Sequence, residues 1–279
     1  MTVPLLSAKF ECLQQRLRAL ESVVVAFSGG VDSAFALKAA VMALGRERVL
    51  AVTGRSPSVP AAELEAAAAL AAEIGAAHEF LDTHEFDDAN YVANPVNRCY
   101  FCKTELYTQL AQLAQQRGFA AVINGVNADD LGDYRPGLQA AAEHDVFAPL
   151  AECGITKAEL RALATELGLS VHDKPASPCL SSRIQYGEAI TPEKLQRIDA
   201  AEAFLRALGF RECRVRHHGT LARIEVPAER IACFADPELR AAVDRRFREL
   251  GYRYVTLDLR GFRSGSMNEV ILGANLARP

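Results

Sequence analysis

The stretch that decides the fold is residues 22–33, which read SVVVAFSGGVDS. Its first half, up to Phe27, is a short apolar run rich in β-branched residues, typical of a buried parallel strand. The run ends abruptly at a Ser-Gly-Gly turn, and residues 32–44 then show helical periodicity. A strand, a glycine turn and a helix in immediate succession predict the first strand–helix unit of a parallel α/β sheet.

The turn between this strand and helix has the chemistry of a phosphate site. Glycines let backbone N–H groups approach an anion closely, and the following helix adds its positive N-terminal end. Serine hydroxyls can donate to phosphate oxygens, and an aspartate can hold Mg²⁺. The candidate residues are Ser28, Gly29, Gly30, Asp32 and Ser33. The alternative is an ordinary glycine turn; the loop matches neither a Walker A loop nor a dinucleotide-binding GxGxxG.

Strands and helices continue to alternate on either side of this loop. We expect strands at 49–53, 78–81 and 120–124, and helices at 10–20, 61–74, 103–117 and 156–167. Such alternation predicts a parallel sheet with helices on both faces, which binds ligands at the carboxyl ends of its strands. Asn127, Asp129 and Asp130 fall at that edge, where they would contact Mg²⁺ or ribose unless they are ordinary turn residues.

The pattern changes after about residue 186. A long helix is expected at 191–208, opened by Thr-Pro-Glu as cap, first-turn proline and acid. Strands at 213–217, 222–226 and 254–259 and a helix at 237–250 complete a smaller α+β domain. We place the linker near Gly187, giving domains 1–186 and 187–279.

Composition limits the classes of protein. The 279 residues are half apolar, enough for one large or two modest cores, and the net charge of −4 lacks the basic balance of a nucleic-acid binder. We find no signal-peptide pattern and no apolar run near the ~20 residues that span a bilayer. Seven cysteines, an odd number, do not indicate a secreted disulfide scaffold. We expect a soluble, cytoplasmic protein.

Three cysteines stand in suggestive contexts. Cys99 and Cys102 form a Cys-x-x-Cys pair before a helix, and Cys179 lies in KPASPCLSSRIQYG at 174–187. A thiolate near Arg183 and Lys174 would have a lowered pKa and be nucleophilic at neutral pH. For the pair, a structural zinc site, a redox pair and inert buried thiols compete with three cysteines that hold an iron–sulfur cluster.

A serine–glycine loop of this form after the first strand resembles the PP-loop ATP pyrophosphatases, which attack the α-phosphate of ATP. The order and spacing of further motifs resemble one family within them, the LarE sulfurtransferases of nickel-pincer nucleotide biosynthesis. These motifs are residues 98–107, 124–137 (NGVNADDLGDYRPG), 175–187, 214–225 (RVRHHGTLARIE) and 258–269 (DLRGFRSGSMNE). The resemblance covers nearly the whole chain.

The resemblance implies a reaction and its cofactors. With ATP and Mg²⁺, family members adenylate a carboxylate of a pyridinium dicarboxylate mononucleotide, and a cysteine thiolate then displaces AMP. The matching residue is Cys179, which either gives up its own sulfur or, with Cys99 and Cys102, holds a [4Fe–4S] cluster that carries an added sulfide. The family also implies a symmetric homo-oligomer such as a hexamer. The alternatives are another PP-loop enzyme, such as a tRNA thiolase, and a non-catalytic nucleotide-binding protein.

Several cations are candidates for anion binding. Lys103 would stabilise charge at the α-phosphate, or it is a solvated helix lysine. Arg214 and Arg216 alternate along a predicted strand, so both face one way and offer planar forks to phosphate or carboxylate. Arg183 is a further cofactor-binding candidate, and Arg260 and Arg263 are weaker ones. His217 and His218 are strand neighbours on opposite faces, which disfavours a joint metal site.

Overall fold

The structure is a computed structural model that describes residues 3–132, 136–175 and 177–263. The chain divides into two compact units. The first unit is Met1–Asp88 with Asn97–Ser177, and the second is Ala89–Val96 with Pro178–Pro279.

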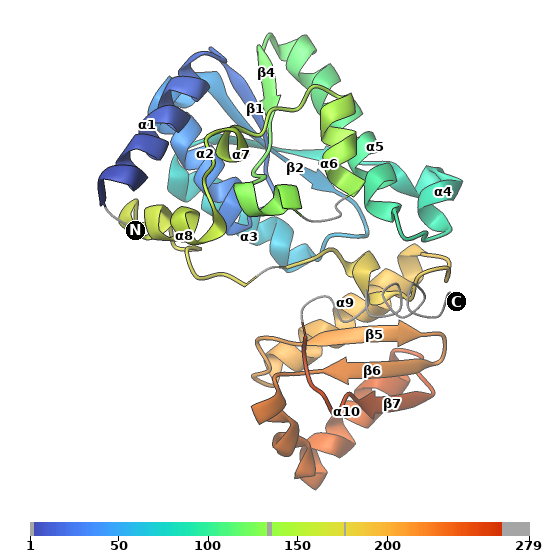
Figure 1. The fold of residues 1–279 in the computed structure, drawn as a ribbon. Coiled ribbons are helices and arrows are strands. Elements are labelled where there is room, and N and C mark those ends of the chain that lie inside the picture. Colours follow the sequence, from blue (N-terminus) through green and yellow to red (C-terminus); the bar gives the residue numbers. More distant parts are fainter. Residues whose placement is uncertain (1–2, 133–135, 176, 264–279) are drawn as a thin grey trace, which may run out of the picture. The chain divides into compact units, whose positions relative to one another are not determined.

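The first unit is built on a four-stranded parallel sheet (Figure 1). Its order is β3 (Ala77–Asp82), β2 (Val49–Arg55), β1 (Val23–Ala26) and β4 (Ala121–Ile123). Strand β1 lies between β2 and β4, so the direction in which strands are added reverses there. The loops that follow β1 and β4 therefore meet at the carboxyl edge of the sheet, where ligands bind in this class of fold. The parallel α/β fold expected from the sequence is confirmed.

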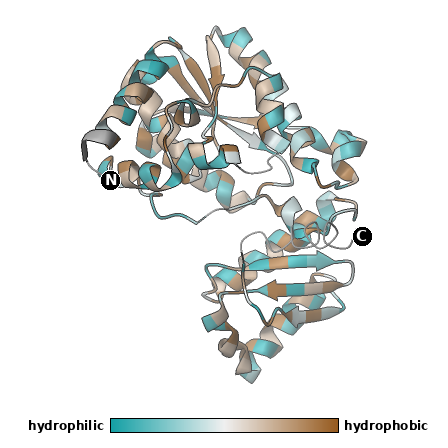
Figure 2. Ribbon diagram, in the orientation of Figure 1, coloured by the Kyte–Doolittle hydropathy of each residue, from teal (hydrophilic) through white to brown (hydrophobic). Residues whose placement is uncertain are grey.

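Helices cover both faces of this sheet because neighbouring strand residues point in opposite directions. Val23 and Val25 pack in one core with apolar residues of α1 (Val3–Arg18), α2 (Val31–Leu44), α3 (Ala61–Ile74) and α8 (Lys157–Glu166). Val24 packs on the other face with α5 (Arg98–Arg117) and α6 (Pro136–Glu143). Figure 2 shows β1 and β4 as hydrophobic strands, as a sheet buried on both faces requires.

The remaining elements of the first unit are short. They are α7 (Pro149–Glu152), η1 (Arg46–Arg48), η2 (Glu85–Asp87) and η3 (Ala128–Gly132). Cys12 of α1 and Cys153, which follows α7, form a disulfide with a Cα–Cα distance of 6.0 Å. No disulfide was expected from the sequence, whose odd number of cysteines did not indicate a disulfide scaffold. The two cysteines are 141 residues apart, and only the packing of α1 beside α7 brings them together.

The second unit contains a three-stranded sheet. Strand β5 (Arg214–His218) is antiparallel to β6 (Leu221–Glu225), which is parallel to β7 (Tyr254–Leu257). Helices α9 (Pro192–Ala207) and α10 (Pro237–Glu249) supply the core with residues such as Leu205 and Phe247. The expected cap of α9 is present, because the Thr191 side chain accepts from the Lys194 N–H. The unit also contains α4 (Ala89–Val92), η4 (Leu180–Arg183) and η5 (Ala228–Ala235).

The division between the units differs in detail from the linker expected near Gly187. The boundary lies after Ser177, and residues 89–96 belong to the second unit. Asn94 holds them there: its side-chain amide donates to the Gln185 carbonyl at 2.8 Å, and its own carbonyl accepts from the Gly187 N–H at 2.9 Å. Sequence patterns report local structure and give no sign of such hydrogen bonds between distant segments.

Within the described part of the chain, no helix is both long and apolar enough to cross a membrane.

Candidate active site

The loop at residues 28–33 has the geometry expected of a phosphate cradle. Gly29 has a φ of 70°, a conformation that side chains resist, and Gly30 is the N-cap of α2. The Ser33 hydroxyl donates to the Gly30 carbonyl at 3.1 Å and accepts from the Ser28 N–H at 3.2 Å. The two serine hydroxyls are 3.1 Å apart. The loop is thus held closed from within, and the N-terminal end of α2 faces it.

The segment after β4 presses against this loop. A Cβ placed on Gly125 would lie 2.6 Å from the Ser33 nitrogen and 2.8 Å from the Asp32 carbonyl carbon, so only glycine permits the contact. Asn127 is 2% exposed, and its amide donates to the Asp32 carboxylate at 3.3 Å. The structure therefore brings together the two loops that the sequence placed separately at the sheet edge.

Asp129 and Asp130 have distinct positions in this cluster. Asp129 accepts from the backbone N–H of Lys157, the first residue of α8, at 2.8 Å. Asp130 accepts from the Asn127 N–H at 3.1 Å. Asp129 thus accepts from one of the first backbone N–H groups of α8, which have no acceptor within the helix, at its positive N-terminal end. Asp32, Asp129 and Asp130 carry the kind of oxygen donor that Mg²⁺ prefers, but the three carboxylates do not gather as one metal-binding group.

Lys157 is a site residue that sequence reasoning missed. Its ammonium lies 2.5 and 2.6 Å from the two carboxylate oxygens of Asp32. Both side chains are about one-third exposed, at 35% and 31%. The available signal was the Thr-Lys-Ala-Glu sequence at 156–159, a capping box that starts a helix at this edge of the sheet.

Lys174 contacts the phosphate loop and not Cys179. Its ammonium donates to the Gly29 carbonyl at 3.2 Å and to Glu63 at 2.8 Å. The expectation that Lys174 activates the Cys179 thiol therefore receives no support from its contacts. Lys174 instead ties the loop to the first turn of α3.

Cys99 and Cys102 lie at the start of α5, three residues apart and so on one face of the helix. Cys99 is exposed and Cys102 partly buried, and neither is in a disulfide. Lys103 follows on the same helix, with its ammonium 5.6 Å from the centre of the Tyr107 ring. Among the described residues of either unit, no three His, Cys, Asp or Glu side chains gather as a metal-binding group.

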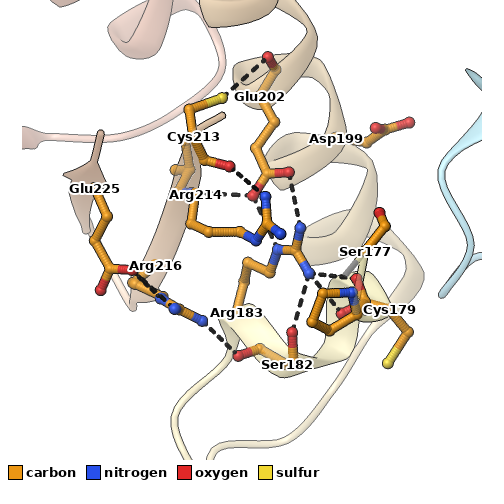
Figure 3. A network of polar contacts seen from close by, with 12 residues as sticks. Ser177, Cys179, Ser182, Arg183, Asp199, Glu202, Cys213, Arg214, Arg216 and Glu225 are labelled. Atoms are coloured by element: carbon orange, nitrogen blue, oxygen red, sulfur yellow. Dashed lines mark hydrogen bonds and ion pairs between the residues drawn. The ribbon is translucent and has the colours of Figure 1, made fainter. Parts of the chain in front are cut away.

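Cys179 lies in the second unit, directly before η4, and is partly buried. Arg183 does not face its sulfur, as Figure 3 shows. The Arg183 guanidinium is buried, donates twice to Glu202 at 2.9 and 3.0 Å, and donates to the carbonyls of Pro178 and Cys179. The expected activation of the thiol by this charge is thus replaced by a different role, because Arg183 fixes the backbone of the cysteine loop.

Arg214 and Arg216 come from one face of β5, as their spacing predicted (Figure 3). Arg216 is 6% exposed, pairs with Glu225 at 2.8 Å and donates to the Ser182 carbonyl at 3.1 Å. Arg214 is partly buried, and its guanidinium lies 5.1 Å from the centre of the Phe262 ring. Burial, followed by the positive charge of Arg183, lowers the pKa of Arg214.

These residues form a cluster with more cationic than anionic groups. The guanidinium groups of Arg183, Arg214 and Arg216 gather about the carboxylates of Glu202 and Glu225, which also contact Arg206 at 3.4 Å and Arg223 at 3.3 Å. An additional anion would therefore relieve repulsion among the arginines, which is the property expected of a site for phosphate or carboxylate.

The remaining candidates of the second unit lie around this sheet. His217 contacts Tyr252 and Glu188, whereas His218 contacts Gln185, so the two imidazoles point to opposite faces as expected. Burial lowers the pKa of both histidines. Arg263 approaches Asp258 at 3.5 Å, and Asp258 also accepts from the Arg260 N–H. Parts of three motifs lie outside the described residues. They are 264–269 of the motif at 258–269, 133–135 of the motif at 124–137, and residue 176 of the motif at 175–187.

Comparisons with known proteins agree with this fold and loop. The family model described as NAD synthase matches residues 6–96, which include the phosphate loop. A protein of Synechocystis that is itself uncharacterised is 50% identical over 96% of this chain and 99% of its own length. The pyridinium-3,5-bisthiocarboxylic acid mononucleotide synthase of Lactiplantibacillus plantarum is 42% identical over 98% of each chain. An argininosuccinate synthase of Halobacterium salinarum is 29% identical over 49% of this chain.

The sheet, its glycine loop and these similarities define an ATP-dependent enzyme of the PP-loop class. The 42% identity to the Lactiplantibacillus synthase, which extends over nearly the full length of both chains, places the chain within one branch of that class. The chain belongs to the LarE family of ATP-dependent sulfurtransferases.

Proposed function

We propose that this enzyme uses Mg·ATP to adenylate a carboxylate of pyridinium-3,5-dicarboxylate mononucleotide and converts that carboxylate to a thiocarboxylate. The observation that carries the proposal is the closed phosphate loop at the start of α2, beside Asp32 and Asn127, in a chain 42% identical to a synthase of the bisthiocarboxylate. This one reaction would use both the ATP site and the anion-binding cluster, the first for the nucleotide and the second for the substrate.

The first half-reaction belongs to the first unit. The backbone of the loop and the N-terminus of α2 would bind phosphate oxygens, and Asp32 would hold Mg²⁺ with help from Asn127 and Asp129. A substrate carboxylate oxygen attacks the α-phosphorus, the bond to the β-phosphate oxygen breaks, and pyrophosphate leaves. Adenylation turns a carboxylate oxygen, which leaves badly, into part of AMP, which leaves easily. Lys103 is our candidate for stabilising the charge at the α-phosphate.

The second half-reaction needs a thiol and an anion site, and we assign both to the second unit. The surplus of guanidinium charge around Arg214 and Arg216 supports capture of the substrate phosphate or its second carboxylate. Arg183 would act by holding the carbonyl of Cys179, and so the loop on which the thiol is carried. Where Cys179 is the nucleophile, its thiolate attacks the acyl carbon, AMP leaves, and a thioester links enzyme and substrate.

Two sulfur routes lead from the acyl adenylate, and they differ in the task of the cysteines; only the first passes through the Cys179 thioester. In one, a base removes the α-proton of Cys179, its Cβ–Sγ bond breaks, and sulfur stays on the product while the residue becomes dehydroalanine. In the other, Cys99, Cys102 and Cys179 hold a [4Fe–4S] cluster, which when bound would supply sulfur as a sulfide. Two cysteines outside any disulfide, on one face of α5, fit such ligation, and we favour this route because it gives Cys99 and Cys102 a task.

Pyrophosphate release tests the adenylation step. The wild-type enzyme should release pyrophosphate only when both ATP and the pyridinium substrate are present, and Asp32→Ala should abolish release while keeping the fold. Asp244→Ala, which removes a surface ion pair with Arg248 on α10, is the matched control and should release pyrophosphate normally. Normal release by Asp32→Ala would refute the assignment of the ATP site.

Intact mass and absorbance of one anaerobic sample separate the two sulfur routes. With a cluster, the protein is brown, turns over repeatedly when sulfide is supplied and keeps its mass, and Cys99→Ala or Cys102→Ala bleaches it. With sacrifice, the colourless protein loses the elements of H₂S from Cys179 in a single turnover. Cys179→Ala must be inactive on either route, so sulfur transfer by that variant would contradict our placement of the thiol.

We further propose that the working enzyme is a cytoplasmic homo-oligomer that acts on a small anionic nucleotide, without a nucleic-acid partner. The net charge of −4 supports a small-molecule substrate over RNA. Light scattering on the purified chain should give a mass that is a multiple of 30.3 kDa. A monomer at working concentration would contradict the oligomer.

A further inference from the structure

The carboxylate that we assign to Mg²⁺ already carries a cation. The Lys157 ammonium contacts both Asp32 oxygens, at 2.5 and 2.6 Å, so it bridges the carboxylate as a metal ion would. Mg²⁺ binds carboxylate oxygens at about 2.0–2.1 Å. An ammonium in that position and a divalent ion cannot both fit, and their like charges repel. Lys157 therefore competes with the metal for Asp32.

The backbone of Lys157 is fixed on several sides. Its N–H donates to Asp129 at 2.8 Å, and the preceding Thr156 caps α8 through reciprocal hydrogen bonds with Glu159. The Lys9 ammonium also holds this turn, through the Gly154 carbonyl at 2.7 Å and Glu159 at 2.8 Å. The side chain, in contrast, is about one-third exposed and carries its ammonium on a flexible four-carbon stem. Only the ammonium is free to change partner while the helix stays in place.

We propose that Lys157 is an exchangeable cation of the nucleotide loop. It holds Asp32 while the enzyme is empty, and it transfers to the phosphate oxygens when Mg·ATP binds. Asp32 then takes the metal only together with the nucleotide, because the triphosphate draws the ammonium away. This role rests on the ATP site proposed above and adds an order of binding to it: free metal does not occupy Asp32 before ATP arrives.

The competition predicts a gain of metal binding when the lysine is removed. Lys157→Met keeps the length of the side chain and leaves the Asp32 carboxylate without its ammonium. Mn²⁺, a spectroscopic substitute for Mg²⁺, should then bind the nucleotide-free full-length protein about fivefold more tightly than it binds wild type. The electron paramagnetic resonance signal of free Mn²⁺ measures this binding without any turnover. A misfolded variant would lose binding and cannot imitate a gain.

Two further variants show whether the gain arises at Asp32. Asp32→Asn combined with Lys157→Met should return Mn²⁺ binding to the wild-type level or below. Lys194→Met is the matched control, because Lys194 pairs with Glu188 at 2.9 Å with similar exposure, 24% and 27%, in the second unit. It should bind Mn²⁺ as wild type does.

The same titration with a non-hydrolysable ATP analogue completes the test. Wild type should bind Mn²⁺ more tightly when the analogue is present, and Lys157→Met should lose most of this enhancement. No gain in Lys157→Met without nucleotide, or a gain that survives Asp32→Asn, would overturn the exchange. Failure of wild type to bind the analogue at all would instead refute the proposed ATP site, so the two failures are distinguishable.

Discussion

At the scale of single residues, Arg183 and Glu202 form a buried ion pair in the second unit. Arg183 is 1% exposed and Glu202 is fully buried. Burial, the largest single effect, raises the pKa of Glu202, but the charge and hydrogen bonds of Arg183, the Val215 N–H and the charge of Arg214 together outweigh it, so the pKa is lowered overall. The pair therefore stabilises the fold in its ionised form.

Removing one partner should be costly. Arg183→Met removes the two shortest arginine contacts of the buried Glu202 carboxylate and leaves it the longer 3.4 Å contact with Arg206. We expect a loss of roughly 3–5 kcal/mol in the free energy of unfolding, measured by urea denaturation. Arg246→Met removes an exposed pair with Glu249 and should cost less than about 1 kcal/mol. Equal losses in the two variants would contradict the role of burial.

The same pair predicts a pH dependence. A carboxylate with a lowered folded pKa stabilises the protein above its unfolded pKa, about 4.3, and this stability is lost as the pH falls through the folded pKa. Without Arg183, burial raises the pKa of Glu202. Protonation of Glu202 at low pH then removes the buried negative charge that destabilises the variant. The gap in unfolding free energy between wild type and Arg183→Met should therefore narrow from pH 7 to pH 4. A gap that widens would show that Glu202 is not ionised in the fold.

Cys213 offers a second test at this scale. Burial raises the pKa of its thiol to about 12, so at pH 8 only roughly one molecule in 10⁴ carries the thiolate that reacts. Cys99 is exposed. Iodoacetamide should label Cys99 of the metal-free folded protein and leave Cys213 unlabelled until urea is added, as peptide mass spectrometry would show. Equal rates in the folded protein would refute the buried placement of Cys213.

At the scale of elements, the site depends on how closely β4 and its loop approach the start of α2. The contact at Gly125 is between backbones, which cannot move aside as a flexible side chain does. The segment thereby sets the position of Asn127 opposite Asp32. A small change in this packing should alter the phosphate loop without touching any ligand-binding side chain.

Gly125→Ala tests this dependence. The added methyl group would force the loop away from α2, and we expect at least about tenfold weaker binding of an ATP analogue by calorimetry and roughly 1–3 kcal/mol lower stability. Gly132→Ala in the same segment is the control, since a Cβ there meets nothing within 4 Å, and it should bind normally. Unchanged affinity in Gly125→Ala would show that the contact does not shape the loop.

At the scale of the whole molecule, the two units are interleaved in sequence. Residues 89–96 leave the first unit, complete the second, and are followed by α5 of the first. The Tyr91 hydroxyl lies 2.7 Å from that of Ser181. Asn94 is fully buried and has a φ of 53°. The second unit is therefore incomplete if the chain is simply cut near the linker.

Asn94→Ala should loosen that unit alone. It removes the hydrogen bonds to the 185–188 segment and places alanine at a φ that favours glycine or asparagine, for a cost of about 1–3 kcal/mol. Hydrogen exchange should quicken at the Gly187 and Ile190 amides and stay unchanged in β1 and β2. Asn94→Gly keeps the backbone conformation and should cost less. Faster exchange in β1 would contradict the assignment of this segment to the second unit.

Much of the architecture could be predicted from local patterns. The order of strands and helices, the position of the glycine loop and the cap of α9 follow from periodicity, β-branching and capping chemistry, which neighbours in sequence determine. The short helices α4, α6 and α7 were not predicted, because segments of one or two turns carry too little periodicity. The paired face of Arg214 and Arg216 was predicted because strand residues alternate with period two.

The sequence by itself determined the class of fold, the place of the phosphate loop and, through motif order, the family. Only the tertiary structure decided which partners the candidate side chains have. Lys157 meets Asp32 across 125 residues, Lys174 turns to Glu63, and Arg183 pairs with Glu202 instead of facing the thiol of Cys179. The physical reason is that backbone conformation follows from near neighbours, whereas a charged side chain takes its partner from whatever the packed elements bring within reach.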